Sequence, residues 1–279
     1  MNIVILTGAE LRHDYVRKLL ALTPGVHVQR SYCEDMNLES FVREQPGSKC
    51  ERLAHLAMRA QSEQDCFAIF CGFIEDRSNP VRLSKGEINE DHRIDEIKLL
   101  SPDLIVAYGC SLIKAPLLAA FNRRILNVHL GLSPYYRGSS TNYWPLVNKA
   151  PEYVGATFMY MDEGIDTGEI IHQIRARIYS GDSAHQIGNR LIGDVALIYG
   201  DIIQNFKNLK STEKLSEPAK IYYYRRSDFS EESVQILRGN FVAGLIDKYN
   251  SHKQERCRTV PIIKNPAVRK VDAMMEFVQ

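Results

Sequence analysis

Paired cysteines are missing from this chain. Its six cysteines stand at positions 33, 50, 66, 71, 110 and 257, and no two of them form a Cys-x-x-Cys motif. This spacing argues against a zinc site and against a disulfide framework. Because most of these cysteines lie within apolar segments, we expect buried, reduced thiols and no bound metal.

Long apolar runs are missing as well. Residues 1–6 have no basic flank and no extended apolar core, and no later window holds enough consecutive apolar residues to cross a bilayer. We therefore expect a cytoplasmic protein without membrane contact. Apolar residues make up 44% of the 279 positions and charged residues 25%, an ordinary balance for a globular protein that buries a full core.

A surplus of charge of either sign is the third absence. The formal net charge is +1. The chain as a whole therefore has no electrostatic attraction for nucleic acid, which weighs against a tRNA substrate.

The Gly-x-Gly-x-x-Gly fingerprint of dinucleotide-binding folds is the fourth absence, although the chain opens like such a fold. Residues 3–6 and 26–32 are predicted strands, and between them apolar side chains recur at helical spacing at Leu11, Tyr15, Leu19 and Leu22. This βαβ opening predicts a parallel sheet with a site at the carboxyl ends of its strands. Thr7-Gly8-Ala9-Glu10 does not supply the fingerprint, so a dinucleotide-dependent oxidoreductase has little support.

Further along, the patterns predict more helices and strands. A buried strand is expected at residues 103–109, and residues 67–73 either continue the preceding helix or form another buried strand. The Ser183-Ala184-His185-Gln186 capping box opens a long amphipathic helix. The other predicted helices cover residues 50–63, 91–100 and about 231–249.

Residues 125–130 form the most informative stretch. If they are a strand, its period of two places Ile125, Asn127 and His129 on one face. An amide and an imidazole then share one surface near the end of the strand. Another predicted strand, residues 153–160, leads into a loop in which Gly164 and Gly168 mark a sharp turn, with Asp166 at its tip.

These three polar side chains suit acyl transfer to an amine. When an amine attacks an acyl carbon, the carbonyl oxygen gains negative charge that an amide N–H or an imidazolium stabilises. The attacking nitrogen must lose a proton and the leaving nitrogen must gain one. A histidine beside a carboxylate, such as His129 beside Asp166, meets that need near neutral pH.

On these residues the chain resembles the formyltransferase family that uses 10-formyltetrahydrofolate, whose members act on glycinamide ribonucleotide, methionyl-tRNA or amino sugars. The family pattern is an Asn-x-His on a strand, a Pro five residues after the His, a Gly shortly after that, and a later Asp-x-Gly turn. Here the pattern is met by Asn127, His129, Pro134, Gly138 and Asp166-Thr167-Gly168. The likeness covers about the first two hundred residues. Gly131-Leu132-Ser133-Pro134 departs from the usual Ser-Leu-Leu-Pro.

The resemblance implies roles for several residues. It makes Asn127, His129 and Asp166 catalytic, and it assigns the folate donor to the loop after residue 109 and to the turn before Asp166. The implied folate-binding residues are Cys110, Ser111, Leu112, Asp162 and Gly164. Arg137 and Gly138 are the candidates for acceptor binding. The alternatives are structural: Cys110 and Leu112 pack, Arg137 is a solvated loop residue, and Asp166 only forms a turn.

The expected reaction is formyl transfer from 10-formyltetrahydrofolate to the primary amine of a small acceptor, such as a nucleotide-linked amino sugar. The chain lacks the glycine-rich phosphate loop with which glycinamide ribonucleotide formyltransferases hold their substrate. It also has little room for the β-barrel carried by methionyl-tRNA formyltransferases. A methionyl-tRNA formyltransferase-like enzyme and a non-catalytic folate or metabolite-binding module remain the alternatives.

The expected fold is α/β, with a Rossmann-like, mostly parallel sheet flanked by helices. We predict a catalytic domain over residues 1–207, and a linker with a small helical or mixed appendage over residues 208–279. The linker is centred on the polar segment 207–220. Tyr222-Tyr223-Tyr224 is interpreted as an aromatic strand edge, with ring stacking as the alternative. A homodimer is one of the assemblies left open.

Overall fold

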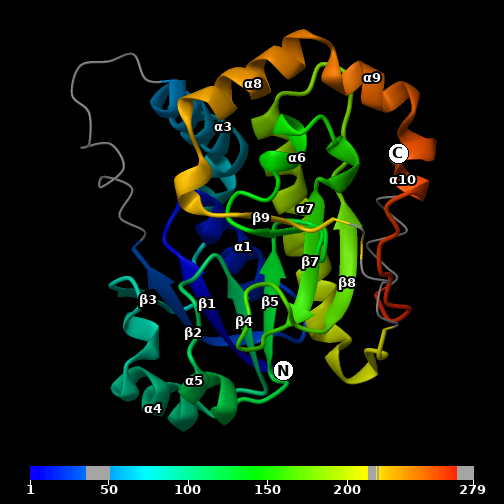
Figure 1. The fold of residues 1–279 in the computed structure, drawn as a ribbon. Helices are drawn as coiled ribbons and strands as arrows, with labels where there is room; N and C mark the ends of the chain where they lie inside the picture. Colours follow the sequence, from blue (N-terminus) through cyan, green and yellow to red (C-terminus); the bar gives the residue numbers. More distant parts are fainter. Residues whose placement is uncertain (36–50, 213–217, 219, 269–279) are drawn as a thin grey trace.

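A seven-stranded sheet forms the centre of the computed structural model, which describes residues 1–35, 51–212, 218 and 220–268 (Figure 1). The strand order is β3-β2-β1-β4-β5-β7-β8. The first five strands in this order are parallel, and β7 and β8 run antiparallel to their neighbours. The strands are β1 (Asn2–Gly8), β2 (His27–Glu34), β3 (Pro80–Leu83), β4 (Leu104–Tyr108), β5 (Ile125–His129), β7 (Gly155–Tyr160) and β8 (Ile170–Arg175).

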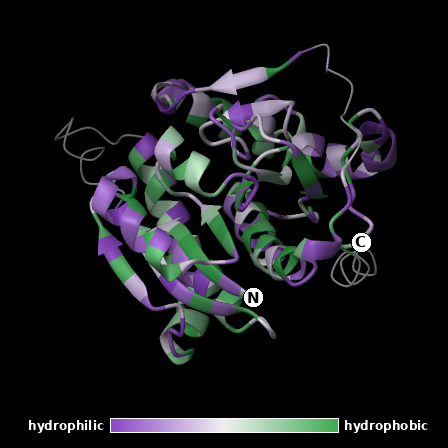
Figure 2. Cartoon of the chain, turned by 90° about the horizontal axis from the view of Figure 1, so that it is seen from below, coloured by the Kyte–Doolittle hydropathy of each residue, from purple (hydrophilic) through white to green (hydrophobic). Residues whose placement is uncertain are grey.

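Helices cover both faces of the sheet because successive strand residues point to opposite sides. Along β5, Leu126 and Val128 belong to one buried cluster and Ile125 to the other. The first cluster is covered by α1 (Leu11–Ala21), α3 (Glu51–Phe73) and α7 (Ala184–Gln204), and the second by α4 (Asp91–Leu100) and α5 (Ala115–Ala120). Figure 2 shows hydrophobic colour along the inner strands and hydrophilic segments on the surrounding helices.

Helix α7 ties the central strands to the helical layer. It begins at the predicted capping box, in which the Ser183 side chain accepts from the Gln186 backbone N–H. Midway along it, the hydroxyl of the fully buried Tyr199 donates to the Leu126 carbonyl oxygen at 2.9 Å and accepts from the Ala107 N–H at 3.1 Å. This bridge fixes the spacing of β4 and β5, whose ends carry the site described below.

A second, two-stranded sheet joins the late part of the chain to the loop after β5. Strand β6 (Tyr136–Gly138) pairs in parallel with β9 (Tyr222–Tyr224). Helix α8 (Glu231–Val242) contacts α3 and α6 (Trp144–Val147), and α9 (Leu245–Ser251) and α10 (Lys253–Arg258) follow it. The single-turn helices are η1 (Glu87–Asn89), η2 (Pro151–Tyr153), η3 (Phe206–Asn208) and η4 (Arg226–Asp228).

The structure confirms the expected α/β fold with a mostly parallel sheet and helices on both faces. The predicted helix over residues 91–100 is α4, and the βαβ opening is β1, α1 and β2. The tyrosines at 222–224 form a strand, as predicted. No helix in the described ranges is long and apolar enough to cross a membrane.

Several predictions about single elements need correction. Residues 67–73 continue α3, so the strand alternative was wrong. The predicted helix at 231–249 is broken into α8 and α9, because Gly244 adopts a positive φ of 78°. In α1, Val16 and Leu20 are the buried apolar residues, whereas Leu22 is 42% exposed.

The expectation of buried thiols holds for Cys33 but not for Cys66, which is exposed; Cys71, Cys110 and Cys257 are half-buried. Cys50 and part of the predicted linker, residues 213–217 and 219, lie outside the described residues. The division of the chain at residue 207 stays a prediction.

Candidate active site

The carboxyl ends of β4 and β5 lie side by side at one edge of the sheet and border a cavity of about 850 Å³. Parallel strands point their carboxyl ends the same way, and a ligand site at this edge is the usual consequence. The cavity is lined by residues from β4, β5, the loop after β7, and helices α1, α3 and α7. Residues that follow β9, namely Arg225, Arg226 and Phe229, also line the cavity.

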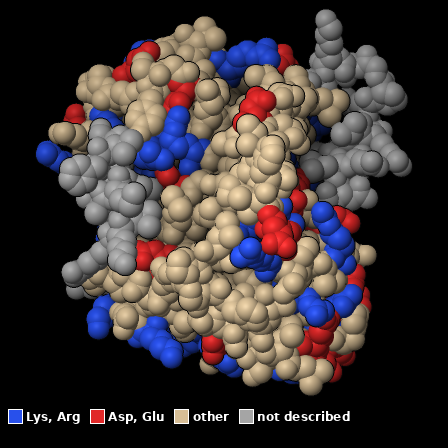
Figure 3. Space-filling view, turned by 180° about the vertical axis from the view of Figure 1, so that it is seen from behind, with Lys and Arg blue, Asp and Glu red and all other residues tan. Residues whose placement is uncertain are grey.

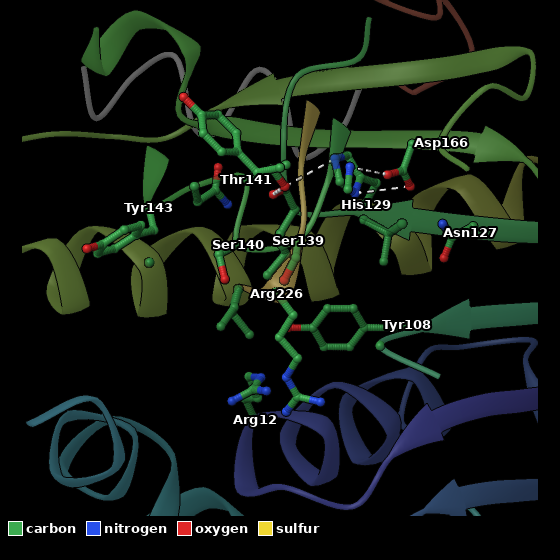
Figure 4. Close-up of a pocket in the computed structure, with 18 of the residues that line it drawn as sticks. Arg12, Tyr108, Asn127, His129, Ser139, Ser140, Thr141, Tyr143, Asp166 and Arg226 are labelled. Atoms are coloured by element: carbon green, nitrogen blue, oxygen red, sulfur yellow. Dashed lines mark hydrogen bonds and ion pairs between the residues drawn. The ribbon is translucent and has the colours of Figure 1, made fainter. Parts of the chain in front are cut away.

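His129 and Asp166 both line this cavity and lie next to each other (Figure 4). His129 ends β5, and its Nδ1 lies 3.2 Å from Asp166 Oδ1. The His129 side chain is 8% exposed and that of Asp166 11%. Residues 37 positions apart in sequence are thus brought together as predicted, in a setting where water screens their interaction poorly.

Thr141 holds the other side of the His129 ring. Its hydroxyl donates to the Leu130 carbonyl oxygen and lies 3.1 Å from His129 Nε2. The Tyr136 carbonyl oxygen lies 3.2 Å from the same nitrogen. Since both groups act as acceptors toward Nε2, this nitrogen carries a hydrogen. Thr141 has no local sequence motif that could have identified it, and sequence reasoning missed it.

Burial lowers the pKa of His129 from its ordinary value, although the Asp166 carboxylate and the Tyr136 carbonyl oppose that effect and raise it. Arg137 adds a further lowering contribution. Desolvation therefore disfavours the imidazolium more than Asp166 favours it.

Asp166 is oriented by the backbone. The Gly138 N–H donates to Asp166 Oδ2 at 3.0 Å, which leaves Oδ1 facing the imidazole. Asp166 itself has a positive φ of 54°, a conformation that aspartate tolerates better than most residues. Gly138, predicted to contact the acceptor, therefore holds the carboxylate and also lines the cavity.

Asn127 lies two residues before His129 on β5, on the same face as Ile125. Its half-buried side chain lines the cavity, and no hydrogen bond among the described residues engages its amide. An uncommitted amide N–H of this kind can donate to a carbonyl oxygen that enters the cavity.

The loop after β4 also lines the cavity, with all three of its predicted residues, Cys110, Ser111 and Leu112. The Ser111 N–H donates to Glu34 Oε2, and the Gly86 N–H donates to Glu34 Oε1 at 2.7 Å, so a buried carboxylate fixes the loop from behind. The Ser111 hydroxyl is buried, and none of the described residues forms a hydrogen bond with it. Burial raises the pKa of Cys110 to about 12, with Glu34 as a smaller cause, so Cys110 remains a neutral thiol.

Asp162 and Gly164 line the same cavity from the turn before Asp166. Asp162 Oδ1 accepts from the Gly164 N–H at 3.1 Å and from the Thr167 hydroxyl at 2.8 Å. Both residues therefore shape the turn that carries Asp166. Arg137, the other predicted acceptor residue, is not among the residues that line the cavity.

Buried polar residues support the loop that follows His129. The Thr157 hydroxyl donates to the Gly131 carbonyl oxygen at 2.6 Å and accepts from the Ser133 N–H at 3.0 Å. Gln173 Nε2 donates to the Ser133 carbonyl oxygen at 2.6 Å, and its Oε1 accepts from the Ile263 N–H. The loop that departs from the family pattern is thus held from β7, β8 and the late chain.

Gly131, in the loop after His129, has no space for a side chain. A Cβ atom there would lie 2.6 Å from His129 Nε2 and 2.7 Å from Thr141 Oγ1. We expect Gly131→Ala to displace the imidazole and to lower turnover by about tenfold or more, since small misplacements of catalytic groups are costly. The measurement is kcat. Gly239→Ala, where a Cβ meets nothing within 4 Å, is the control, and equal kcat values in the two variants would contradict the expectation.

Comparison with known proteins identifies a family likeness across the site. The family model for formyl transferase matches residues 54–196, just over half of the chain, including Asn127, His129 and Asp166. A methionyl-tRNA formyltransferase of Halothermothrix orenii is 33% identical over 177 residues. That match takes in 58% of this chain and 53% of the relative, so the chain spans about half the length of this curated relative.

Two solved structures share the fold. A sugar N-formyltransferase from a Shewanella species superposes with a TM-score of 0.54 at 22% identity, covering 82% of this chain and 78% of that one. A phosphoribosylglycinamide formyltransferase from Anaplasma phagocytophilum has a TM-score of 0.54 at 12% identity, covering 81% of this chain and 98% of that one. At such identities the likeness concerns the fold.

Proposed function

Because this chain belongs to the formyl transferase family, we propose that it transfers a formyl group from 10-formyltetrahydrofolate to a primary amine. The observation that carries the proposal is the His129–Asp166 pair, 3.2 Å apart, with Asn127 beside it in one cavity. A binding module without catalysis would have no need for a buried imidazole matched to a carboxylate.

Each residue has a distinct task in this proposal. The Asn127 amide donates to the formyl oxygen and stabilises the negative charge that develops there as the amine attacks. His129 takes part in the same stabilisation, accepts the proton that the attacking amine loses and passes it to the departing nitrogen of tetrahydrofolate. Asp166 holds the imidazole in place and lowers the cost of charging it, since a nearby carboxylate favours the protonated ring. Burial of the pair excludes water, which strengthens both effects.

The loop after β4 suits the folate. Ser111 lines the cavity, its buried hydroxyl has no hydrogen-bond partner in the described part of the chain, and Leu112 beside it is 61% exposed. A ligand ring with hydrogen-bonding edges would bond to the Ser111 hydroxyl and cover the Leu112 side chain. Asp162 and Gly164 would border the same ligand from the opposite loop. No metal is required for this chemistry.

For the acceptor we favour a small amine, in particular an amino sugar on a nucleotide carrier. Figure 3 shows basic and acidic side chains interspersed on the face seen from behind, rather than a broad basic surface for tRNA.

Methionyl-tRNA is the second candidate acceptor. The observation that favours it is the 33% identity over 177 residues with a methionyl-tRNA formyltransferase. A screen of amine acceptors with 10-formyltetrahydrofolate, scored by mass spectrometry, separates the candidates. Formylation of methionyl-tRNA, with none of the nucleotide-linked amino sugars modified, would replace the first candidate by the second.

A stable folate analogue is expected to raise the melting temperature of this protein, because a ligand that binds only the folded state stabilises it by mass action. At a concentration 100 times the Kd, the gain in the free energy of unfolding is about 2.7 kcal/mol. NAD and NADP are expected to leave the melting temperature unchanged. A thermal shift with a dinucleotide and none with folate would favour an oxidoreductase instead.

A further inference from the structure

Strand β6 contacts both members of the His129–Asp166 pair with its backbone. The carbonyl oxygen of Tyr136, the first residue of β6, lies 3.2 Å from His129 Nε2. The N–H of Gly138, its last residue, donates to Asp166 Oδ2 at 3.0 Å. The position of this short strand therefore affects the imidazole and the carboxylate together.

A single strand from the late part of the chain pairs with β6. Within the described ranges, β9 is the only strand that is hydrogen-bonded to it. The Tyr222 N–H donates to the Tyr135 carbonyl oxygen at one end of the pairing, at 2.8 Å. At the other end, the Ser139 N–H donates to the Tyr224 carbonyl oxygen, also at 2.8 Å. Because two such short strands form few backbone hydrogen bonds, contacts between their side chains contribute much of the pairing.

Aromatic rings provide these side-chain contacts. Tyr222 lies opposite the fully buried Tyr136 and stacks on it, with ring centroids 4.7 Å apart and planes 12° from parallel. Tyr224 stacks on Trp144, with centroids 4.1 Å apart and planes 6° from parallel. Stacked rings stabilise a contact beyond the burial of their apolar area. The Tyr222 ring thus holds the residue whose carbonyl oxygen contacts His129.

Tyr222 itself is set back from the cavity. Tyr223 and Tyr224 line the cavity, whereas Tyr222 does not. The half-buried Tyr222 ring contacts Tyr136 and also Lys220, whose Nζ lies 4.5 Å from the ring centroid. A change at Tyr222 therefore reaches bound substrates indirectly, by way of β6.

We propose that Tyr222 is a positioning residue of the His129–Asp166 pair. By stacking on Tyr136 it fixes β6, and β6 sets the orientation of the imidazole and of the carboxylate. The inference rests on the proposed formyl transfer, in which this pair handles the proton of the amine. It gives β9, which lies in the segment expected to be an appendage, a role in the reaction. Since small misplacements of catalytic groups are costly, losing the ring should lower kcat more than it changes KM.

Substitutions at position 222 test the proposal. We expect Tyr222→Ala to lower kcat by about tenfold or more and to leave the KM values of donor and acceptor largely unchanged. Tyr222→Phe should keep the normal kcat, because a phenyl ring stacks as a phenol ring does. If circular dichroism shows that the alanine variant does not fold, Tyr222→Leu replaces it, since leucine fills the space without a ring. Normal kcat in a folded variant without the ring, or an equal loss in Tyr222→Phe, would overturn the proposal.

Tyr179→Ala is the matched control. Like Tyr222, Tyr179 does not line the cavity, and the guanidinium of Arg190 lies 4.5 Å from its ring centroid. Its kcat should equal that of the unaltered protein.

A double-mutant cycle tests whether Tyr222 acts through the pair. In the Asp166→Asn background, Tyr222→Ala should lower kcat by a smaller factor than in the unaltered protein, because the carboxylate that β6 orients is already absent. The same factor in both backgrounds would mean independent effects and would contradict the proposal.

The imidazole NMR signals of His129 provide a measurement that needs no substrate. Since the chain has eight histidines, these signals are assigned by their loss in His129→Ala. Tyr222→Ala should shift them, and Tyr222→Phe should not; unshifted signals in Tyr222→Ala would sink the positioning role. Shifted signals in a protein that formylates no amine would sink the reaction and keep the positioning role. Formyl transfer that Tyr222→Ala does not slow would do the reverse.

Discussion

Replacing His129 with alanine is expected to lower turnover by about 100-fold or more, the usual cost of removing a group that stabilises charge in the transition state. Asn127→Ala should have an effect of the same order. In the proposed reaction both side chains act mainly on charge that exists only in the transition state, so acceptor and folate binding should change far less than kcat. The measurement is kcat and KM with folate donor and acceptor, supported by the folate thermal shift.

The fold of each variant needs a separate check, because His129 is buried and contacts Thr141 and Tyr136. Circular dichroism and the folate-induced thermal shift provide it. His92→Ala, on a side chain that is 57% exposed on α4, serves as the matched control and should turn over normally. Near-normal turnover in a well-folded His129→Ala variant would end the catalytic assignment.

Asp166→Asn is expected to fold and to bind folate, yet to turn over slowly with an altered pH profile. The Asp166 carboxylate raises the pKa of His129 against the larger lowering by burial. Removing the charge eliminates the raising contribution, so the His129 pKa falls further. The limb of the activity profile that reports His129 should therefore move to lower pH.

Glu169→Gln is the appropriate control for that experiment. Glu169 is a nearby carboxylate that pairs with Arg123 at 2.9 Å and does not line the cavity. Removing the Glu169 charge should leave the pH dependence of activity unchanged. If Asp166→Asn also keeps the profile and a near-normal rate, Asp166 is only a turn residue and the chemistry rests on Asn127 and His129.

Much of the fold could be predicted because its signals are local. The period of two in β5 and the helical period with a capping box before α7 are both readable over a few residues. The broken helix at Gly244 was missed because a lone glycine within a helical pattern is ambiguous without its φ angle. Residues 67–73 were ambiguous because a short apolar run suits a buried strand and a buried helix equally.

The residues of the candidate site also fall into two groups, those that a local motif identifies and those that only the folded structure reveals. Asn127, His129 and Asp166 stand in a recognisable order, so the sequence could assign them. Thr141 and Gln173 could not be found, since their importance arises from contacts with His129 and with the loop at Ser133 that no motif encodes. Arg12, Arg59 and Arg226 lie on three separate elements, and only folding brings them to one cavity.

The backbone conformation of Gly138 restricts which residues can occupy position 138 in related sequences. Its φ is 90°, and a Cβ atom there would lie 2.2 Å from the Tyr224 carbonyl oxygen, while its N–H holds Asp166. Any side chain at position 138 would disturb β9 and the Asp166 carboxylate together. Among homologues that keep this arrangement, position 138 should therefore remain glycine, and an alignment of them would display it as an invariant column.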